Sequence, residues 1–229
     1  MRTSLAAVLF ASSLAACGGG GGGSNGPDAR PIGDVGPVTC TAPNAFGQPT
    51  LSMTDSQHSG PDTDGSEKLE FFGLLNSDPL PDSLYLSFFN GYAPFDPDIM
   101  PTTVTLTGDQ ADYATCGACV EIDTDLSDAG DLTDIYFVNG GTLNITSTTT
   151  NLTGTIMNAS FVHSIIDNDT LETTPSPDGC VTSIASVSFT AAITQADDTG
   201  GSGSGSANLA RVGGSHGRRG GTRLKLQLH

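Results

Sequence analysis

The middle of the chain alternates apolar and polar side chains with a period of two. In the clearest run, Val187, Phe189 and Ala191 fall on one side of an extended chain, while Ser188 and Thr190 fall on the other. Successive side chains of a strand point to opposite faces of its sheet, so this run predicts a strand with one buried face. Similar alternation predicts further strands over the ranges 69–75, 84–88, 102–107, 113–122 and 152–165.

No part of this middle region shows the three-to-four-residue repeat of an amphipathic helix. Threonine and serine are plentiful, whereas lysine and glutamate are scarce, and this composition also favours strands. We therefore predict an all-β domain over residues 40–195, an antiparallel β-sandwich or jelly roll of about eight strands. A closed barrel is the alternative arrangement.

Two positions in the pattern predict irregular backbone. Asn139-Gly140 separates two β-rich runs, and both residue types tolerate positive φ, so we expect a tight hairpin turn there. The apolar phase slips between Ile156 and Phe161, and this slip predicts a β-bulge near residues 157–159.

The first residues have the pattern of a secretory signal peptide. A short start containing Arg2 precedes a mostly apolar stretch that is too short to span a membrane. The stretch ends in Leu14-Ala15-Ala16-Cys17, which resembles the lipobox of bacterial lipoproteins. That resemblance implies that residues 1–16 are removed and that Cys17 is acylated, which anchors the chain to a membrane.

A linker rich in glycine and proline occupies residues 17–39. In the lipoprotein family an Asp directly after the acylated Cys tends to hold the protein in the inner membrane. Gly18 occupies that position here, so the resemblance implies the outer membrane. The lipobox, the linker, Cys40 and the later stretches Tyr113–Val120, Gly140–Leu143 and Gly179–Phe189 are together similar to lipoproteins of the myxobacterial type. This likeness covers about residues 17–195 and implies a fold and an envelope address, without an activity.

The charge of the chain is strongly negative and unevenly placed. Its 229 residues include 25 Asp and Glu against 8 Lys and Arg, a net charge of −17. All the acids lie between Cys17 and Asp198, where Arg30 and Lys68 are the only cations. Binding to nucleic acid depends on clustered Lys and Arg, so we do not expect the folded body to bind nucleic acid or, unaided, an anionic membrane. Divalent cations and cationic ligands remain compatible with this charge.

Residues 196–229 are rich in glycine and serine and end in a basic stretch. Five of the eight cations lie between Arg211 and Lys225. We predict that this tail is disordered. Two alternatives stay open: the tail folds back on the acidic body through long-range attraction, or it contacts anionic lipid or nucleic acid.

Four cysteines remain beyond Cys17. In an exported chain they predict two disulfides. One pairing joins Cys40 to Cys180 and Cys116 to Cys119, and the alternative sends each of the two central cysteines to a distant one. Cys-Gly-Ala-Cys also has the spacing of a thioredoxin-type redox site, but its flanks predict strand rather than the helix that such a site requires.

The densest acidic run, residues 123–134, contains four candidate calcium ligands, Asp123, Asp125, Asp128 and Asp131. Closely spaced hard oxygen ligands on a glycine-containing loop suit Ca²⁺, although the spacing is not that of an EF-hand. The competing interpretation is a solvated acidic loop that joins two strands, and this is the one we favour.

No arrangement of residues in the sequence predicts catalysis. His163 has no second histidine nearby, so we expect a solvent or core residue rather than a ligand or base. We predict a lipid-anchored envelope protein with a non-enzymatic β-sandwich module for binding or structure, whose partner is an envelope protein or a glycan. The alternatives are a surface adhesion domain stabilised by Ca²⁺ and an envelope hydrolase that uses paired carboxylates on a jelly-roll scaffold.

Overall fold

The computed structural model describes residues 38–61 and 65–196. The predicted signal peptide, Cys17, nearly all of the predicted linker and the basic tail therefore lie outside the described residues. Within the described ranges, no helix is long and apolar enough to cross a membrane.

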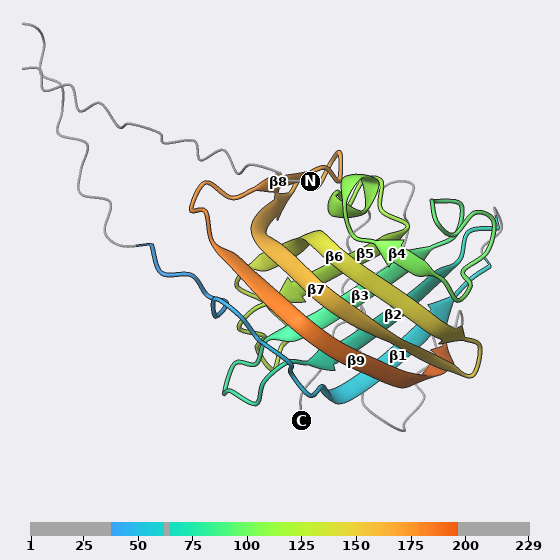
Figure 1. The fold of residues 1–229 in the computed structure, drawn as a ribbon, viewed down its shortest axis with the longest axis horizontal. Coiled ribbons are helices and arrows are strands. Elements are labelled where there is room, and N and C mark those ends of the chain that lie inside the picture. The colour runs from blue at the N-terminus through green and yellow to red at the C-terminus, as the bar shows by residue number, and fades with distance from the viewer. Residues whose placement is uncertain (1–37, 62–64, 197–229) are drawn as a thin grey trace, which may run out of the picture. The chain divides into compact units, whose positions relative to one another are not determined.

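The described residues form nine strands and one short 3₁₀ helix, which confirms the all-β prediction (Figure 1). The elements are β1 (Ser52–Ser59), β2 (Lys68–Leu74), β3 (Ser83–Phe89), β4 (Thr103–Thr105), η1 (Gly108–Ala111), β5 (Ala118–Asp123), β6 (Ile135–Thr148), β7 (Asn151–Ile166), β8 (Thr173–Pro175) and β9 (Val181–Gln195).

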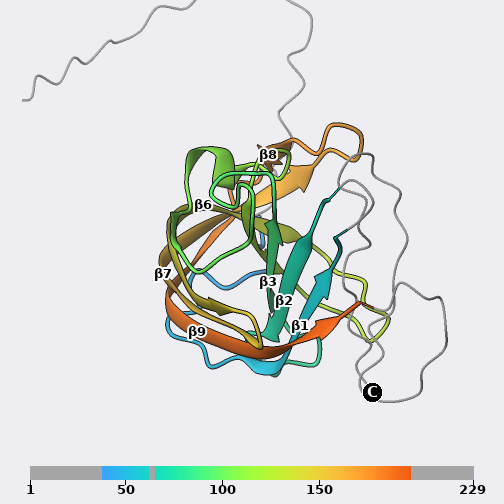
Figure 2. The same ribbon diagram turned by 90° about the vertical axis from the view of Figure 1, so that its right-hand side faces the viewer.

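One sheet holds all nine strands, in the order β4-β6-β5-β3-β2-β1-β9-β7-β8. β6 also pairs with β7, so the sheet closes on itself through β1, β2, β3, β5, β6, β7 and β9. The strands of this ring pair antiparallel, except that Ser56–His58 of β1 runs parallel to Ile193–Gln195 of β9. Figure 2 shows the strands curving around a common interior.

The interior of the closed sheet is filled by one large apolar cluster. Phe71 of β2 packs against Phe189 of β9, with ring centroids 5.1 Å apart, and Phe88 of β3 packs edge-on against Phe95 at 5.6 Å. Burying a side chain of this size contributes about 2–3 kcal/mol. Because the partners come from strands distant in the sequence, the core stabilises the closure of the sheet.

The predicted hairpin turn at Asn139-Gly140 is wrong, because β6 runs unbroken through these residues. The connection to β7 lies at residues 149–150 instead. At Gly141 φ is +118°, and a Cβ atom there would lie only 2.6 Å from the Cα of Ala159. The glycines therefore serve a close approach between two long strands rather than a turn.

The predicted bulge near residues 157–159 is confirmed. The pairing of β6 with β7 shifts on both sides of Gly140, and the facing Asn158 has a φ of 51°. This irregularity lets Ile156, Ala159 and Phe161 all reach the core, although strict alternation would turn one of them outward.

The strand predicted over 113–122 begins only at Ala118. The residues before it form turns that follow η1, and a Cβ atom on Gly117 would lie 2.4 Å from the carbonyl oxygen of Ala93. The Cys116–Cys119 disulfide spans the junction between these turns and β5. The strand therefore begins five residues later than the sequence pattern predicts.

Two disulfides confirm the prediction from the cysteines and decide the pairing. Cys40 bonds to Cys180 across 140 residues of sequence, and Cys116 bonds to Cys119 across three. In the chain-entropy description the first stabilises the fold by about 5 kcal/mol and the second by about 2 kcal/mol. Of the two disulfides, the long-range one therefore contributes more to the stability of the body.

Gly154 offers a test of the packing between β7 and the core. A Cβ atom there would lie 2.5 Å from the ring of Phe189 and 2.5 Å from the carbonyl oxygen of Asn144. We expect Gly154→Ala to displace Phe189 from Phe71 and to lower the free energy of unfolding by about 3 kcal/mol, measured by denaturant unfolding.

Gly47→Ala is the matched control. Gly47 has a φ of +67°, but a Cβ atom there meets nothing within 4 Å. This variant should lose only the conformational preference, about 1 kcal/mol. Equal losses in the two variants would show that crowding at Phe189 does not decide the effect.

Candidate functional site

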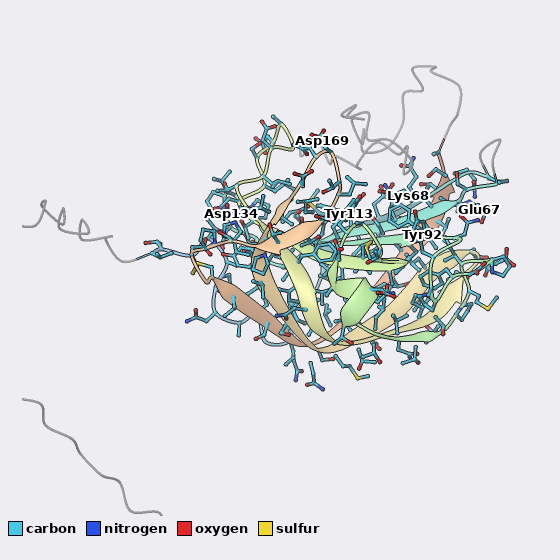
Figure 3. The ribbon with its side chains drawn as sticks, turned by 90° about the horizontal axis from the view of Figure 1, so that it is seen from above. Glu67, Lys68, Tyr92, Tyr113, Asp134 and Asp169 are labelled. Carbon is cyan, nitrogen blue, oxygen red and sulfur yellow. A yellow bond between two sulfur atoms is a disulfide. The ribbon has the colours of Figure 1, made fainter. Side chains whose placement is uncertain are left out.

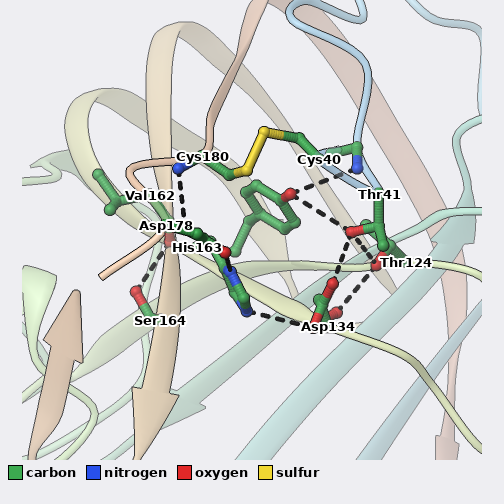
Figure 4. Close-up of polar contacts among 11 residues, drawn as sticks. Cys40, Thr41, Thr124, Asp134, Val162, His163, Ser164, Asp178 and Cys180 are labelled. Atoms are coloured by element: carbon green, nitrogen blue, oxygen red, sulfur yellow. Dashed lines mark hydrogen bonds and ion pairs between the residues drawn. A yellow bond between two sulfur atoms is a disulfide. The ribbon is translucent and has the colours of Figure 1, made fainter. Parts of the chain in front are cut away.

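A network of polar side chains surrounds His163 of β7, next to the Cys40–Cys180 disulfide (Figure 4). His163 lies directly across from Tyr136 of β6, and their rings stack with centroids 5.3 Å apart. Only 16% of the His163 side chain is exposed. The pairing of β6 with β7 thus fixes both rings at one end of the sheet.

Both nitrogens of the His163 ring face a carboxylate. Nε2 lies 3.2 Å from Oδ1 of Asp134, and Nδ1 contacts Oδ2 of Asp178. An imidazole donates from both nitrogens only in its doubly protonated form, so this arrangement suits a charged histidine between two carboxylates. His163 is therefore not the solitary side chain that we expected from the sequence.

Asp178 ties this network to the disulfide. The backbone N–H of Cys180 donates to Asp178 Oδ1 at 2.9 Å, and this bond is the main reason that the pKa of Asp178 lies below its usual range. The hydrogen bond from His163 and the positive charge of that ring lower the same pKa further. In return, the backbone N–H of His163 donates to the carbonyl oxygen of Cys180 at 2.9 Å.

Hydroxyl groups occupy the other side of the network. The hydroxyl of Thr41 donates to Asp134 Oδ2 at 2.9 Å and lies 3.3 Å from the hydroxyl of Tyr136. The hydroxyl of Thr124 donates to that of Thr41 at 3.0 Å. The backbone N–H of Ala42 donates to the Tyr136 hydroxyl at 3.4 Å. These bonds hold the first residues after Cys40 against β6.

An acidic cavity of about 530 Å³ lies beside the network and shares Cys40 and Thr41 with it. Three carboxylates line it, those of Asp78, Asp82 and Asp125. The remaining lining residues are Ala42, Pro43, Asn76, Pro79 and Leu80.

Asp82 is the buried carboxylate of this cavity. It accepts a hydrogen bond from the backbone N–H of Asp125 at 3.1 Å and one from the side-chain amide of Asn76 at 3.0 Å. Burial raises the pKa of Asp82, and the negative charges of Asp125 and Asp78 raise it further against the effect of these hydrogen bonds. The cavity therefore suits a positively charged or hydrogen-bond-donating group.

The four predicted calcium ligands are not gathered at one place by any contact of the described residues. Asp123 is buried at the end of β5, and Asp125 lines the cavity. Asp128 is exposed, and the backbone N–H of Asp131 donates to Ser127 at 3.0 Å. No group of three or more His, Cys, Asp or Glu side chains within the described ranges is placed to hold a metal ion. Calcium binding stays a prediction that this geometry does not support.

Sequence reasoning missed the residues that matter most at this end of the sheet. Asp178 and Asp82 stand outside the acidic run and carry no motif of their own. The one feature of the sequence that could have indicated Asp178 is its position two residues before Cys180, because a disulfide restricts the backbone of the residues next to it. No protein family, curated protein or solved structure matches the chain. Function is therefore inferred from the sequence and the geometry of the described residues.

His163 provides a test of the network. We expect His163→Ala to lower the free energy of unfolding by about 2 kcal/mol, because it removes the ring stacked on Tyr136 and leaves the partly buried Asp134 without its histidine partner. Denaturant unfolding measures this loss.

His58→Ala is the matched control, because His58 makes comparable but more open contacts. It lies 3.7 Å from Glu67 and 3.2 Å from Gln195. The expected loss is below about 1 kcal/mol. If His58→Ala lowers the free energy of unfolding as much as His163→Ala does, the network around His163 contributes no more to stability than an ordinary histidine contact.

The raised pKa of Asp82 predicts a pH dependence of stability. A carboxyl group whose pKa is higher in the folded state than in the unfolded state, where it is about 3.9, destabilises the fold as it ionises. The contribution of Asp82 to stability should therefore be most favourable at low pH and fall as the pH rises through its folded pKa. We expect Asp82→Asn to lack this fall, measured by unfolding at a series of pH values above about 4.

Asp178→Asn should behave in the opposite way. The pKa of Asp178 is lowered, so its contribution to stability is present above about pH 3.9 and disappears as the pH falls through the folded pKa. This variant should be less stable than the natural chain at neutral pH and approach it in acid. Parallel pH profiles for both variants and the natural chain would contradict these assignments.

Proposed function

We propose that the chain is a lipid-anchored protein of the bacterial outer membrane, whose folded body is a non-enzymatic module for binding or structure. The observation that carries the proposal is the Cys40–Cys180 disulfide at the point where the linker meets the body. Disulfides form and persist in oxidising compartments, which supports export from the cytoplasm. The lipobox-like sequence Leu14–Cys17 supports acylation of Cys17 and attachment through that lipid.

The first residues after the linker are fixed to the body by a covalent bond and by hydrogen bonds. Cys40 is bonded covalently to Cys180, and the next residue, Thr41, is hydrogen-bonded to Asp134 and lies within hydrogen-bond distance of Tyr136. Tension on the linker would therefore act on a cross-link that joins the first described residues to the start of β9.

The chemistry of the body favours binding over catalysis. Both ring nitrogens of His163 are engaged by carboxylates of the body, so neither nitrogen is turned toward the cavity as a free base. The described residues include nineteen Asp and Glu against Lys68 as the only Lys or Arg, a net charge of −18. Such a surface repels nucleic acid and anionic lipid, and the cavity beside Thr41 suits a cationic group of an envelope protein or glycan.

Acylation of Cys17 is tested by replacing that residue. We expect the natural chain, expressed in a bacterial host with a labelled fatty acid, to take up the label and to sediment with membranes. Cys17→Ala should do neither. Cys40→Ala, which removes a structural cysteine, should keep the label and so serves as the control. An unlabelled natural chain would contradict the lipid anchor.

A second measurement separates a tethering module from an enzyme that acts on a diffusible substrate. A strain that lacks the protein is complemented with the natural chain or with Cys17→Ala behind an ordinary cleavable signal peptide. A module that links structures should restore the envelope only when it is anchored. Equal rescue by the soluble variant would favour a diffusible enzyme.

A further inference from the structure

The Cys40–Cys180 disulfide borders the acidic cavity. Cys40 and the following residue, Thr41, both line this cavity of about 530 Å³. Cys40 is partly exposed, whereas each of the other three disulfide cysteines is no more than 3% exposed: Cys116, Cys119 and Cys180. A dissolved reagent therefore approaches this disulfide on the side of Cys40, next to the cavity.

Reduction of a disulfide begins with the attack of a thiolate. The thiolate forms a mixed disulfide with the sulfur of Cys40, and the electron pair of the broken bond leaves on the sulfur of Cys180. A second thiolate then attacks the sulfur of the reductant in this mixed disulfide and releases Cys40 as a thiolate. Two thiols are thereby oxidised to one disulfide, and the two protein thiolates take up the two protons that those thiols lost. Each step brings negative charge to this bond or leaves it there.

The cavity places negative charge beside Cys40. Three carboxylates line it, those of Asp78, Asp82 and Asp125, and none of its described lining residues is Lys, Arg or His. Lys68 is the only Lys or Arg among the described residues. Figure 3 shows Lys68 well away from Asp134 of the neighbouring network. The described part of the chain therefore has no lysine or arginine at this end to offset the three carboxylates.

The other side of the disulfide is acidic as well. Asp178 accepts a hydrogen bond from the backbone N–H of Cys180 at 2.9 Å, and Asp134 accepts one from the hydroxyl of Thr41 at 2.9 Å. His163 lies between these two carboxylates and contacts both of them (Figure 4). Two carboxylates and one histidine ring thus lie on this side, and three further carboxylates line the cavity.

This distribution of charge opposes the exchange reaction. A cleft lined by charge of one sign focuses the electric field and changes the local concentration of an ion about tenfold or more. An attacking thiolate is an anion, so the carboxylates of the cavity lower its concentration beside Cys40. The thiolate that leaves on Cys180 is disfavoured in turn by the charge of Asp178, because like charges repel. A positive charge on the reductant offsets the first of these two effects.

We propose that the acidic cavity controls thiol–disulfide exchange at Cys40, so that it excludes anionic thiols and admits a thiol with a positive charge close to its sulfur. The cavity then protects the bond that fixes the first described residues to the start of β9. After reduction, the described contacts that hold this segment are the hydrogen bonds of Thr41 and Ala42, so one wall of the cavity loosens. The proposal goes beyond the function proposed above and does not depend on the lipid anchor.

Three thiols of similar size test this proposal. The thiolate of cysteamine has no net charge, that of 2-mercaptoethanol has one negative charge and that of 3-mercaptopropionate has two. The initial rate of Cys40–Cys180 reduction is measured for the folded full-length chain in low salt by alkylation and peptide mapping. The same rates are measured for Asp78→Asn/Asp125→Asn, which removes two carboxylates of the cavity and keeps the buried Asp82. For each thiol, the ratio of variant rate to natural rate cancels the intrinsic reactivity of that thiol.

We expect this ratio to increase with the negative charge of the thiolate. It should be about 5 for 2-mercaptoethanol and about 25 for 3-mercaptopropionate, because the same field acts on one charge and then on two. The ratio should not rise above unity for cysteamine, whose ammonium group is attracted by the carboxylates that the variant removes. In about 0.5 M salt the three ratios should converge, because salt screens the field of the cavity.

Two controls separate the effect of the cavity from other causes. The matched variant Asp98→Asn/Asp109→Asn removes two exposed carboxylates that do not line the cavity, and it should change each rate by less than about twofold. The buried Cys116–Cys119 disulfide reports loss of the fold, because reagents reach it only when the body opens. A change confined to the Cys40–Cys180 bond therefore arises in the folded chain.

Three results would overturn the proposal. Equal ratios for the three thiols would show that the cavity does not select reductants by charge. The same charge-dependent ratios in Asp98→Asn/Asp109→Asn would assign the effect to the net charge of the body rather than to the cavity. Reduction of Cys116–Cys119 as fast as that of Cys40–Cys180 would show that the exchange takes place in the unfolded chain.

Discussion

The short parallel pairing of β1 with β9 is the constraint on which the architecture depends. It is the single parallel contact in a ring of antiparallel strands, and it spans only Ser56–His58 and Ile193–Gln195. Without it the sheet would end in two open edges, and the core between Phe71 and Phe189 would lose one wall. Because β1 comes first and β9 last, the ring closes only when nearly the whole body has folded, which makes its formation a long-range and cooperative event.

The closure also decides where the chain enters and leaves the body. Cys40 precedes the first strand, and its bond to Cys180 fixes the entry to the start of β9. Ala196 leaves from the far end of β9, beside His58 of β1. One long strand therefore holds the linker at one end and releases the C-terminal segment at the other.

A shortage of positive charge shapes the polar contacts of the body. The described residues include nineteen Asp and Glu but only one Lys and no Arg. The buried acids therefore make most of their contacts with other kinds of donor. His163 contacts the carboxylates of Asp134 and Asp178. Backbone N–H groups donate hydrogen bonds to Asp178 and Asp82, and the Tyr85 hydroxyl donates to Glu70. Of these acids, Glu70 also contacts Lys68, whereas the described contacts of Asp134, Asp178 and Asp82 use a histidine ring, hydroxyl, amide or backbone N–H groups. The stability of the body is therefore tied to the protonation of a few residues at its disulfide end.

The fold was predictable where alternation coincides with burial on one side. β9 and the bulge at Asn158 follow from apolar spacing, because the core accepts only one face of each strand. β1 was not predictable, because its residues are almost all polar and lack the apolar alternation. Backbone pairing with β2 and β9 holds it in the sheet. Its buried Ser56 hydroxyl donates to the carbonyl oxygen of Glu70. The hairpin turn at Asn139-Gly140 was predicted wrongly for a related reason. From the sequence alone, a glycine that allows close approach of a neighbouring strand cannot be distinguished from a glycine that allows a turn.

The candidate site was less predictable than the fold, because cross-strand register brings its parts together. Asp134, His163 and Asp178 are spread along the sequence, and their meeting depends on the pairing of His163 with Tyr136 and on the disulfide at Cys180. Neither the strand register nor the disulfide pairing can be predicted from the local spacing of these residues. The acidic run drew attention to Asp123 as a metal ligand, whereas the structure buries this residue at the end of β5.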